Sequence, residues 1–123
     1  MDAQKKVLVV DDDDRMRKLL ANRLEVEGYS IITAQDGEEA MQKVKDESPL
    51  LLTLDLMMPK INGYEACRML RFDDQYKNLP IIILSALNTQ FERDKAFEAG
   101  ADAVFVKPFD LNLLVVKIKE LLE

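Results

Sequence analysis

The sequence predicts an α/β domain in which helices cover both faces of an open, parallel β-sheet. Two observations support this prediction: five short apolar runs alternate with longer segments of helical periodicity, and the glycines and prolines fall at the junctions between them. Each run and the segment after it take up about 25 residues, as expected for repeated β/α units. A closed barrel of eight such units needs about 250 residues. This chain of 123 residues is therefore predicted to form an open, doubly wound sheet.

The five apolar runs are the predicted strands. They lie at Val7–Val10, Tyr29–Thr33, Leu50–Leu54, Ile81–Leu84 and Ala103–Val106. Three or four of these runs are apolar on both faces, which is typical of strands that helices cover on both sides. With right-handed crossovers, the order 2-1-3-4-5 of a flavodoxin-like sheet makes the first and third strands neighbours. Ligand sites in such sheets lie at this switch point, at the carboxyl ends of the strands.

Helical periodicity in the segments that follow the strands predicts five helices, each with an apolar face. The face of the first consists of Met16, Leu19, Leu20 and Leu24, and that of the second of Ala40, Met41 and Val44. Ala66, Cys67 and Leu70 mark the third, and the weakest pattern, Phe91, Lys95, Ala96 and Ala99, marks the fourth. The clearest face, on the last helix, comprises Leu111, Leu114, Val115, Ile118, Leu121 and Leu122.

Residues at the ends of these segments fit helix caps. Gly28 and Gly100 follow the first and fourth helices, where a left-handed C-terminal residue is expected. Asp36 and Asp110 precede the second and fifth helices, where a carboxylate can accept hydrogen bonds from free backbone N–H groups. Asp14 is interpreted as a solvated acid or as the N-cap of the first helix.

Composition restricts the classes of function. With 48% hydrophobic and 33% charged residues, the chain is predicted to be one globular domain over residues 1–123. No apolar run approaches the roughly 20 residues of a membrane span, and the N-terminus lacks the apolar stretch of a signal peptide. A single cysteine, Cys67, is consistent with a cytoplasmic protein. The net charge of −6 argues against binding of nucleic acid or an anionic membrane by this domain.

The sequence contains no histidine. This excludes Ser-His-Asp and Cys-His catalysis and nearly all zinc sites.

Carboxylates gather where the first and third predicted strands end. The first strand is followed by four consecutive acids, Asp11–Asp14, and the third is followed by Asp55. If these strands are parallel neighbours, the carboxylates of Asp11, Asp12 and Asp55 converge at one edge of the sheet. Like charges at that separation are unfavourable unless a cation or a proton neutralises them. Mg²⁺ is the expected ion, because it prefers oxygen ligands and neither strand end offers a histidine or cysteine.

The same edge carries a hydroxyl and an ammonium group. Ser85 follows the fourth predicted strand, and Lys107 follows the fifth, just before Pro108. Taken alone, a serine at a strand end is more often a turn or cap hydroxyl, and a lysine there is as often a solvated surface residue. Together with the acids, however, they place reactive side chains at four of the five strand ends, which favours a shared site.

These residues and their order resemble a two-component response-regulator receiver domain, over essentially the whole chain from about Lys6. The motifs are Val9-Val10-Asp11-Asp12, Leu54-Asp55-Leu56-Met57-Met58-Pro59, Asn62-Gly63, Leu84-Ser85-Ala86, Gly100-Ala101 and Lys107-Pro108-Phe109. No single motif is unique to that family, but their order and spacing together are highly specific. One departure is Ile61-Asn62-Gly63, where the family often has Met-Asp-Gly; asparagine also tolerates turn geometry.

The resemblance implies a signalling function rather than that of a turnover enzyme. A histidine kinase or phosphotransfer protein would donate a phosphoryl group from its phosphohistidine to Asp55, with autodephosphorylation following. Asp12, Asp55 and the backbone carbonyl of Met57 would bind Mg²⁺ directly, and Asp11 would act through water. Lys107 would pair with Asp55 and then with the phosphoryl group, and Ser85 would donate a hydrogen bond to a phosphoryl oxygen.

The resemblance also implies a response at the surface. The family uses a cis peptide before Pro108 to direct Lys107 inward, and Phe105 matches its aromatic switch position. Leu113 and Val116 lie off the apolar face of the last helix, so they are expected to be exposed beside the fourth helix and fifth strand. This surface is predicted to bind a downstream output domain or protein, or to form a phosphorylation-dependent homodimer.

Two other functions are compatible with the same fold class. A Mg²⁺-dependent aspartyl-phosphate phosphatase of the haloacid-dehalogenase type would have a second aspartate two positions after the nucleophile, where this chain has Met57. A flavin-binding electron carrier would need a phosphate-binding loop after the first strand, where Asp11–Asp14 would instead repel a phosphate.

Overall fold

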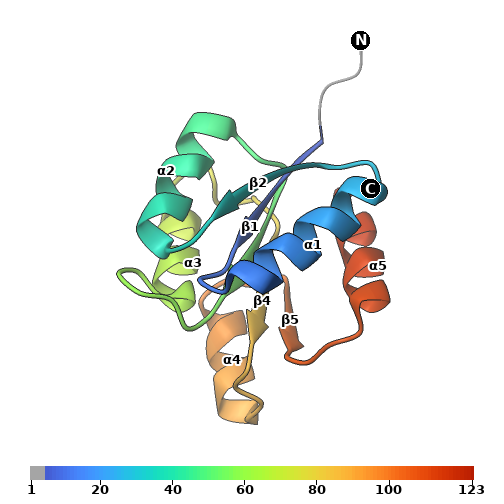
Figure 1. Ribbon diagram of the computed structural model, residues 1–123. Coiled ribbons are helices and arrows are strands. Elements are labelled where there is room, and N and C mark those ends of the chain that lie inside the picture. Colours follow the sequence, from blue (N-terminus) through green and yellow to red (C-terminus); the bar gives the residue numbers. More distant parts are fainter. Residues whose placement is uncertain (1–4) are drawn as a thin grey trace.

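The computed structural model describes residues 5–123 and consists of one five-stranded parallel sheet with helices on both faces (Figure 1). The strands, in the spatial order β2-β1-β3-β4-β5, are β1 (Lys6–Val10), β2 (Ser30–Ala34), β3 (Leu51–Asp55), β4 (Ile81–Ser85) and β5 (Ala103–Val106). The helices are α1 (Asp14–Val26), α2 (Gly37–Glu47), α3 (Gly63–Phe72), α4 (Gln90–Glu98) and α5 (Leu111–Leu122). The predicted fold class and strand order are confirmed.

The helices divide between the two faces of the sheet and bury one apolar cluster on each (Figure 1). On one face, Leu20 and Leu24 of α1 and Leu114 and Ile118 of α5 pack against Val9 and the strand residues around it. Residues of α2, α3 and α4 cover the other face, where they pack against alternate strand residues such as Leu8, Leu52 and Ile83. Because a strand's side chains alternate between faces, each central strand contributes to both clusters.

The strand boundaries differ from the predicted ones by one residue at several ends. Pairing extends β3 to Asp55, which lies opposite Leu84, and extends β4 to Ser85, which lies opposite Val106. The predicted ends of these two strands were the last residues of the apolar runs, Leu54 and Leu84. The ladder continues one residue further because parallel pairing uses backbone groups, which do not depend on the polarity of the side chain.

Two residues assigned to buried helix faces are exposed, so those assignments were wrong. Leu19 of α1 is 51% exposed and Phe91 of α4 is 71% exposed. Leu19 lies five positions before the buried Leu24, and Phe91 five positions before the buried Ala96, so each is rotated about 140° around its helix from that residue. The predicted faces of α2, α3 and α5 are confirmed as buried or partly buried.

The caps follow the predictions except at α1. Asp36 and Asp110 accept hydrogen bonds from backbone N–H groups at the starts of α2 and α5, and Gly28 and Gly100 have φ angles of 100° and 111°. The N-cap of α1 is Asp13 rather than Asp14, because the Asp13 carboxylate accepts from the N–H of Arg15 at 2.9 Å. Asp14 is the first residue of the helix, and its side chain is 75% exposed, which agrees with its other interpretation as a solvated acid.

A buried hydroxyl in β3 provides a test of the packing. Thr53 is fully buried, and among residues 5–123 its Oγ1 has no hydrogen-bond partner. A buried polar group without a partner keeps its desolvation penalty. Thr53→Val, which replaces the hydroxyl by a methyl of similar size, should therefore raise the free energy of unfolding by about 1 kcal/mol, measured by urea denaturation. The exposed Thr33 of β2 offers the control: a gain of equal size in Thr33→Val would contradict this explanation.

Candidate functional site

The parallel sheet brings four polar strand ends to one edge. Asp11 directly follows β1, Asp55 is the last residue of β3, Ser85 is the last of β4, and Lys107 directly follows β5. The central position of β1 and β3 in the strand order makes their carboxyl ends neighbours. The strand order therefore places these four residues at the same edge of the sheet.

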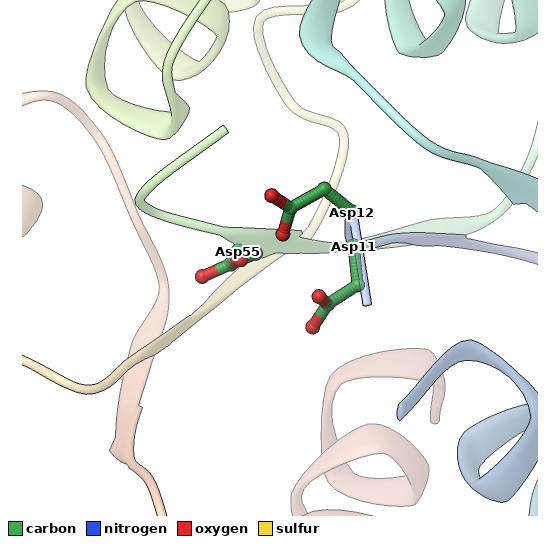
Figure 2. Close-up of side chains that lie close together, drawn as sticks. All are labelled: Asp11, Asp12 and Asp55. Carbon is green, nitrogen blue, oxygen red and sulfur yellow. The ribbon is translucent and has the colours of Figure 1, made fainter. Parts of the chain in front are cut away.

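Three carboxyl groups lie close together at this edge (Figure 2). One oxygen each of Asp11, Asp12 and Asp55 lies within 4.8 Å of the others. Asp11 is 1% and Asp55 6% exposed, whereas Asp12 is exposed to solvent. An all-oxygen set with this charge fits Mg²⁺, which takes oxygen ligands and usually keeps several waters. The open side at Asp12 leaves room for those waters.

Lys107 partly neutralises the acids. Its Nζ lies 2.9 Å from Asp11 Oδ2 and 3.6 Å from Asp55 Oδ1. The resemblance implied a pair with Asp55, but the shorter contact is to Asp11, the more deeply buried of the two acids. Burial by itself lowers the pKa of the Lys107 ammonium, but the hydrogen bond to Asp11 and the charge of Asp55 outweigh it, so the pKa is raised. Lys107 therefore stays charged at neutral pH.

Burial and the repulsion within the cluster appear as a raised pKa of Asp55. Burial and the neighbouring charge of Asp11 raise the pKa of the Asp55 carboxyl to about 6 in the metal-free protein. Lys107 and the N–H of Met57, which donates to Asp55 Oδ1 at 3.4 Å, act in the opposite direction. Three carboxylates against one ammonium leave an excess of negative charge, so a bound cation would lower this pKa.

Hydrogen bonds fix the loop that carries Asp11. Asp11 Oδ1 accepts from the N–H of Asp13 at 2.9 Å, and the carbonyl oxygen of Asp11 accepts from the guanidinium of Arg17 at 2.6 Å. Arg17 also forms an ion pair with Asp14. Arg17 is therefore a residue beside the site that the sequence pattern did not predict. The feature of the sequence that could have indicated it is a basic residue in the first turn of a helix that directly follows the acidic run Asp11–Asp14.

Ser85 is buried at 1% exposure, and its Oγ accepts a hydrogen bond from the N–H of Leu87 at 2.9 Å. The interpretation as a turn hydroxyl therefore describes one of its roles correctly. A hydroxyl can accept and donate at the same time, so Ser85 can still donate its proton to a group bound at the carboxyl edge of the sheet.

The remaining predicted features lie around the site. The peptide bond between Lys107 and Pro108 is cis, as expected. Met57 lies in the loop after β3, with its side chain 63% exposed. Phe105 of β5 is partly buried and contacts the ring of Phe109 edge to face, with 5.9 Å between the ring centroids. The residue at the predicted switch position is therefore half-buried.

Comparison with known proteins places this geometry in a family. Residues 7–119 match the family model described as response regulator receiver domain. The chain is 42% identical over 118 residues to the alkaline phosphatase synthesis transcriptional regulatory protein PhoP of Bacillus subtilis (strain 168), covering 96% of this chain and 48% of that protein. It is 44% identical over 117 residues to the transcriptional regulatory protein ResD of the same organism, covering 95% and 48%.

Solved structures give the same result. The chemotaxis protein CheY4 of Vibrio cholerae superposes with a TM-score of 0.89 at 31% identity, covering 97% of this chain and 99% of that one. The receiver domain of the Francisella response regulator 1452 superposes with a TM-score of 0.90 at 31% identity, covering 97% of each. The chain spans about half the length of the curated relatives it matches. Within residues 5–123, no helix is long and apolar enough to cross a membrane.

The raised pKa of Asp55 leads to a prediction about stability in metal-free buffer. A carboxyl whose folded pKa lies above its unfolded value of about 3.9 binds protons more tightly when folded, so its ionisation destabilises the fold as the pH rises through that range. Asp55→Asn should therefore raise the free energy of unfolding by up to about 3 kcal/mol at pH 7.5. This gain should be lost towards pH 4, as measured by urea denaturation in EDTA.

Asp74→Asn provides the matched control, because the Asp74 side chain is fully exposed. This variant should change stability by less than about 0.5 kcal/mol at either pH. An Asp55→Asn variant that is no more stable than wild type at pH 7.5 would contradict the described balance of charges.

Proposed function

The chain belongs to the response regulator receiver domain family, and on that premise we propose that it accepts a phosphoryl group on Asp55 from the phosphohistidine of a histidine kinase or phosphotransfer protein. It acts as a cytoplasmic signalling domain that carries out its own phosphotransfer and autodephosphorylation. The observation that supports this most directly is the convergence of the buried Asp55 with Asp11, Asp12 and Lys107 at the carboxyl edge of the sheet.

In the proposed transfer, a carboxylate oxygen of Asp55 attacks the phosphorus. A new P–O bond forms while the P–N bond to the donor imidazole breaks, and the electron pair of that bond stays on the imidazole nitrogen, which can then bind a proton. Asp55 needs no general base once it is ionised, and catalysis of this kind is mostly positioning and charge stabilisation. The missing histidine is therefore no obstacle.

The surrounding side chains oppose the repulsion between an anionic nucleophile and an anionic phosphoryl group. Lys107, which lies between Asp11 and Asp55, can turn its ammonium to a phosphoryl oxygen with only a small movement. Ser85 can donate its hydroxyl proton to a second oxygen. Charge-assisted hydrogen bonds of this type are stronger than neutral ones, and they act where charge develops in the transition state.

The cluster is proposed to hold Mg²⁺ through Asp12, Asp55 and the carbonyl of Met57, with Asp11 acting through water. When bound, the ion would supply positive charge to offset the phosphoryl oxygens. The contacts of Asp11 support its indirect role. Its Oδ1 already accepts from the N–H of Asp13, and its Oδ2 from Lys107, whereas Asp12 is exposed and can turn towards an ion.

The phosphatase alternative has little support. An aspartyl-phosphate phosphatase needs an acid two residues after its nucleophile, and Met57 occupies that position with an exposed, non-ionisable side chain. A phosphorylated Asp55 would therefore persist long enough to act as a signal, until water hydrolyses it slowly.

The signal is proposed to leave through the surface formed by α4, β5 and α5. Leu113 and Val116 on α5 are 59% and 51% exposed, and Phe105 on β5 is partly buried. If phosphorylation draws Ser85 inward, the Phe105 ring can follow, and the equilibrium between two arrangements of this surface shifts. The occupant would be an output domain, a downstream protein or a second copy of the chain.

The phosphoacceptor can be identified by intact-mass measurement. Incubation of the wild type with acetyl phosphate and Mg²⁺ should add one phosphoryl mass, because Asp55 attacks the phosphorus and acetate leaves. Asp55→Asn should show no increment while keeping its fold. Ser85→Ala should still be labelled, but several-fold more slowly, since it loses one hydrogen-bond donor to the phosphoryl group. Undiminished labelling of Asp55→Asn would refute the assignment.

The output surface can be tested by sedimentation. Val116→Glu and Leu113→Glu each place a charge on the proposed interface, so they should weaken phosphorylation-dependent association at least tenfold. Val26→Glu is the control, because Val26 lies on α1 and is 82% exposed. If both α5 variants associate like the wild type after phosphorylation, the interface lies elsewhere.

A further inference from the structure

The loop between β3 and α3 contacts the start of α2 at a glycine. A Cβ atom placed on Gly37 would overlap the backbone carbonyl oxygen of Ile61 and would lie 2.6 Å from the Cβ of Ile61. Gly37 has no left-handed φ angle, so the position does not need glycine for its backbone conformation. It needs glycine because the loop backbone occupies the space of a side chain.

The opposite end of the loop is fixed in the same way. The N–H of Gly63 donates to the carbonyl oxygen of Leu56 at 3.0 Å, and a Cβ on Gly63 would lie 2.9 Å from the carbonyl oxygen of Asp55. Residues 57–62 are thus held between two close backbone contacts, one to the strand end that carries Asp55 and the other to α2. Met57 lies within this segment.

The ion pair between Asp36 and Lys60, next to Gly37, contributes little to holding the loop. Asp36 Oδ1 accepts from the N–H of Glu39 at 2.8 Å, while its Oδ2 lies 3.6 Å from Nζ of Lys60. The Lys60 side chain is 58% exposed, and ion pairs at such sites contribute little. Lys60 has a φ angle of 70°, an uncommon conformation for a residue with a side chain. Lys60 adopts this conformation directly before Ile61, the residue that packs on Gly37.

We propose that Gly37 is a positioning residue for the metal site. By allowing Ile61 to pack directly on the start of α2, it sets the path of residues 57–62 and thus the direction in which the Met57 carbonyl is presented beside Asp55. This inference rests on the proposed function, because it assumes that Mg²⁺ binds there. A side chain at position 37 would push the loop outward and weaken the binding of Mg²⁺ without removing any ligand.

Calorimetric titration with MgCl₂ tests the proposal. In Gly37→Ala the dissociation constant for Mg²⁺ should rise about tenfold, the lower end of the effect seen when supporting residues of metal sites are changed. Asp12→Ala, which removes a proposed ligand, should show a larger loss and thereby sets the scale. An unchanged dissociation constant in Gly37→Ala would overturn the proposal.

Gly28→Ala is the matched control for general destabilisation. Gly28 has a φ angle of 100°, so an alanine there is strained, but a Cβ would meet nothing within 4 Å. This variant should lose stability yet bind Mg²⁺ like the wild type, provided that both are measured well below their melting temperatures. If Gly28→Ala loses as much Mg²⁺ affinity as Gly37→Ala, the effect reflects stability and the proposal is wrong.

A measurement on the wild type avoids the question of folding altogether. In a titration followed by NMR, the amide resonance of Gly37 should move with the same dissociation constant as that of Met57, while that of Gly28 stays fixed. A stationary Gly37 resonance beside a moving Met57 would contradict the coupling. Failure of the wild type to bind Mg²⁺ at all would instead contradict the proposed metal site, which keeps the two outcomes distinct.

Discussion

The main constraint on this structure is the concentration of negative charge at one edge of the sheet. Asp11 and Asp55 are almost completely buried there, close to Asp12, and the ammonium of Lys107 contacts both buried acids. A buried carboxylate without such a partner would be strongly unfavourable. Under the proposed function, the carboxylates that make the metal-free cluster unfavourable would bind Mg²⁺ and supply the nucleophile that accepts the phosphoryl group.

The fold tolerates this cost because the rest of the sheet is apolar on both faces. Two separate hydrophobic clusters hold β1, β3 and β4 between the helix layers, and these strands are buried along nearly their whole length. Apart from Thr53 in β3 and Lys6 at the start of β1, the polar residues of these three strands lie at their carboxyl ends, where the ladder stops. Parallel pairing brings all these carboxyl ends to the same edge. The registers of the strand pairs therefore determine the geometry of the site.

Two loops flank the acid cluster, and each is held in place by its own contacts. On one side, Arg17 and Asp13 hold the backbone and side chain of Asp11. On the other, the close approaches at Gly37 and Gly63 hold the segment that follows Asp55. The first set of contacts is polar and the second is steric, so the two loops that flank the cluster are restrained by different physical means. Lys107 links them through its two acidic partners.

Local periodicity and residue polarity were enough to predict the five β/α units, the acids at the ends of β1 and β3, and most helix caps. The strand order was predicted from the flavodoxin-like topology of open, doubly wound sheets. Only the tertiary structure decided that Lys107 lies closer to Asp11 than to Asp55, that Asp13 caps α1, and that Gly37 supports a loop from another part of the chain. The contacts of Lys107 and Gly37 join different elements, whereas the choice of Asp13 as the cap depends on the path of the backbone before α1. Sequence pattern carries no record of such distances, since many loop paths are compatible with the same periodicity.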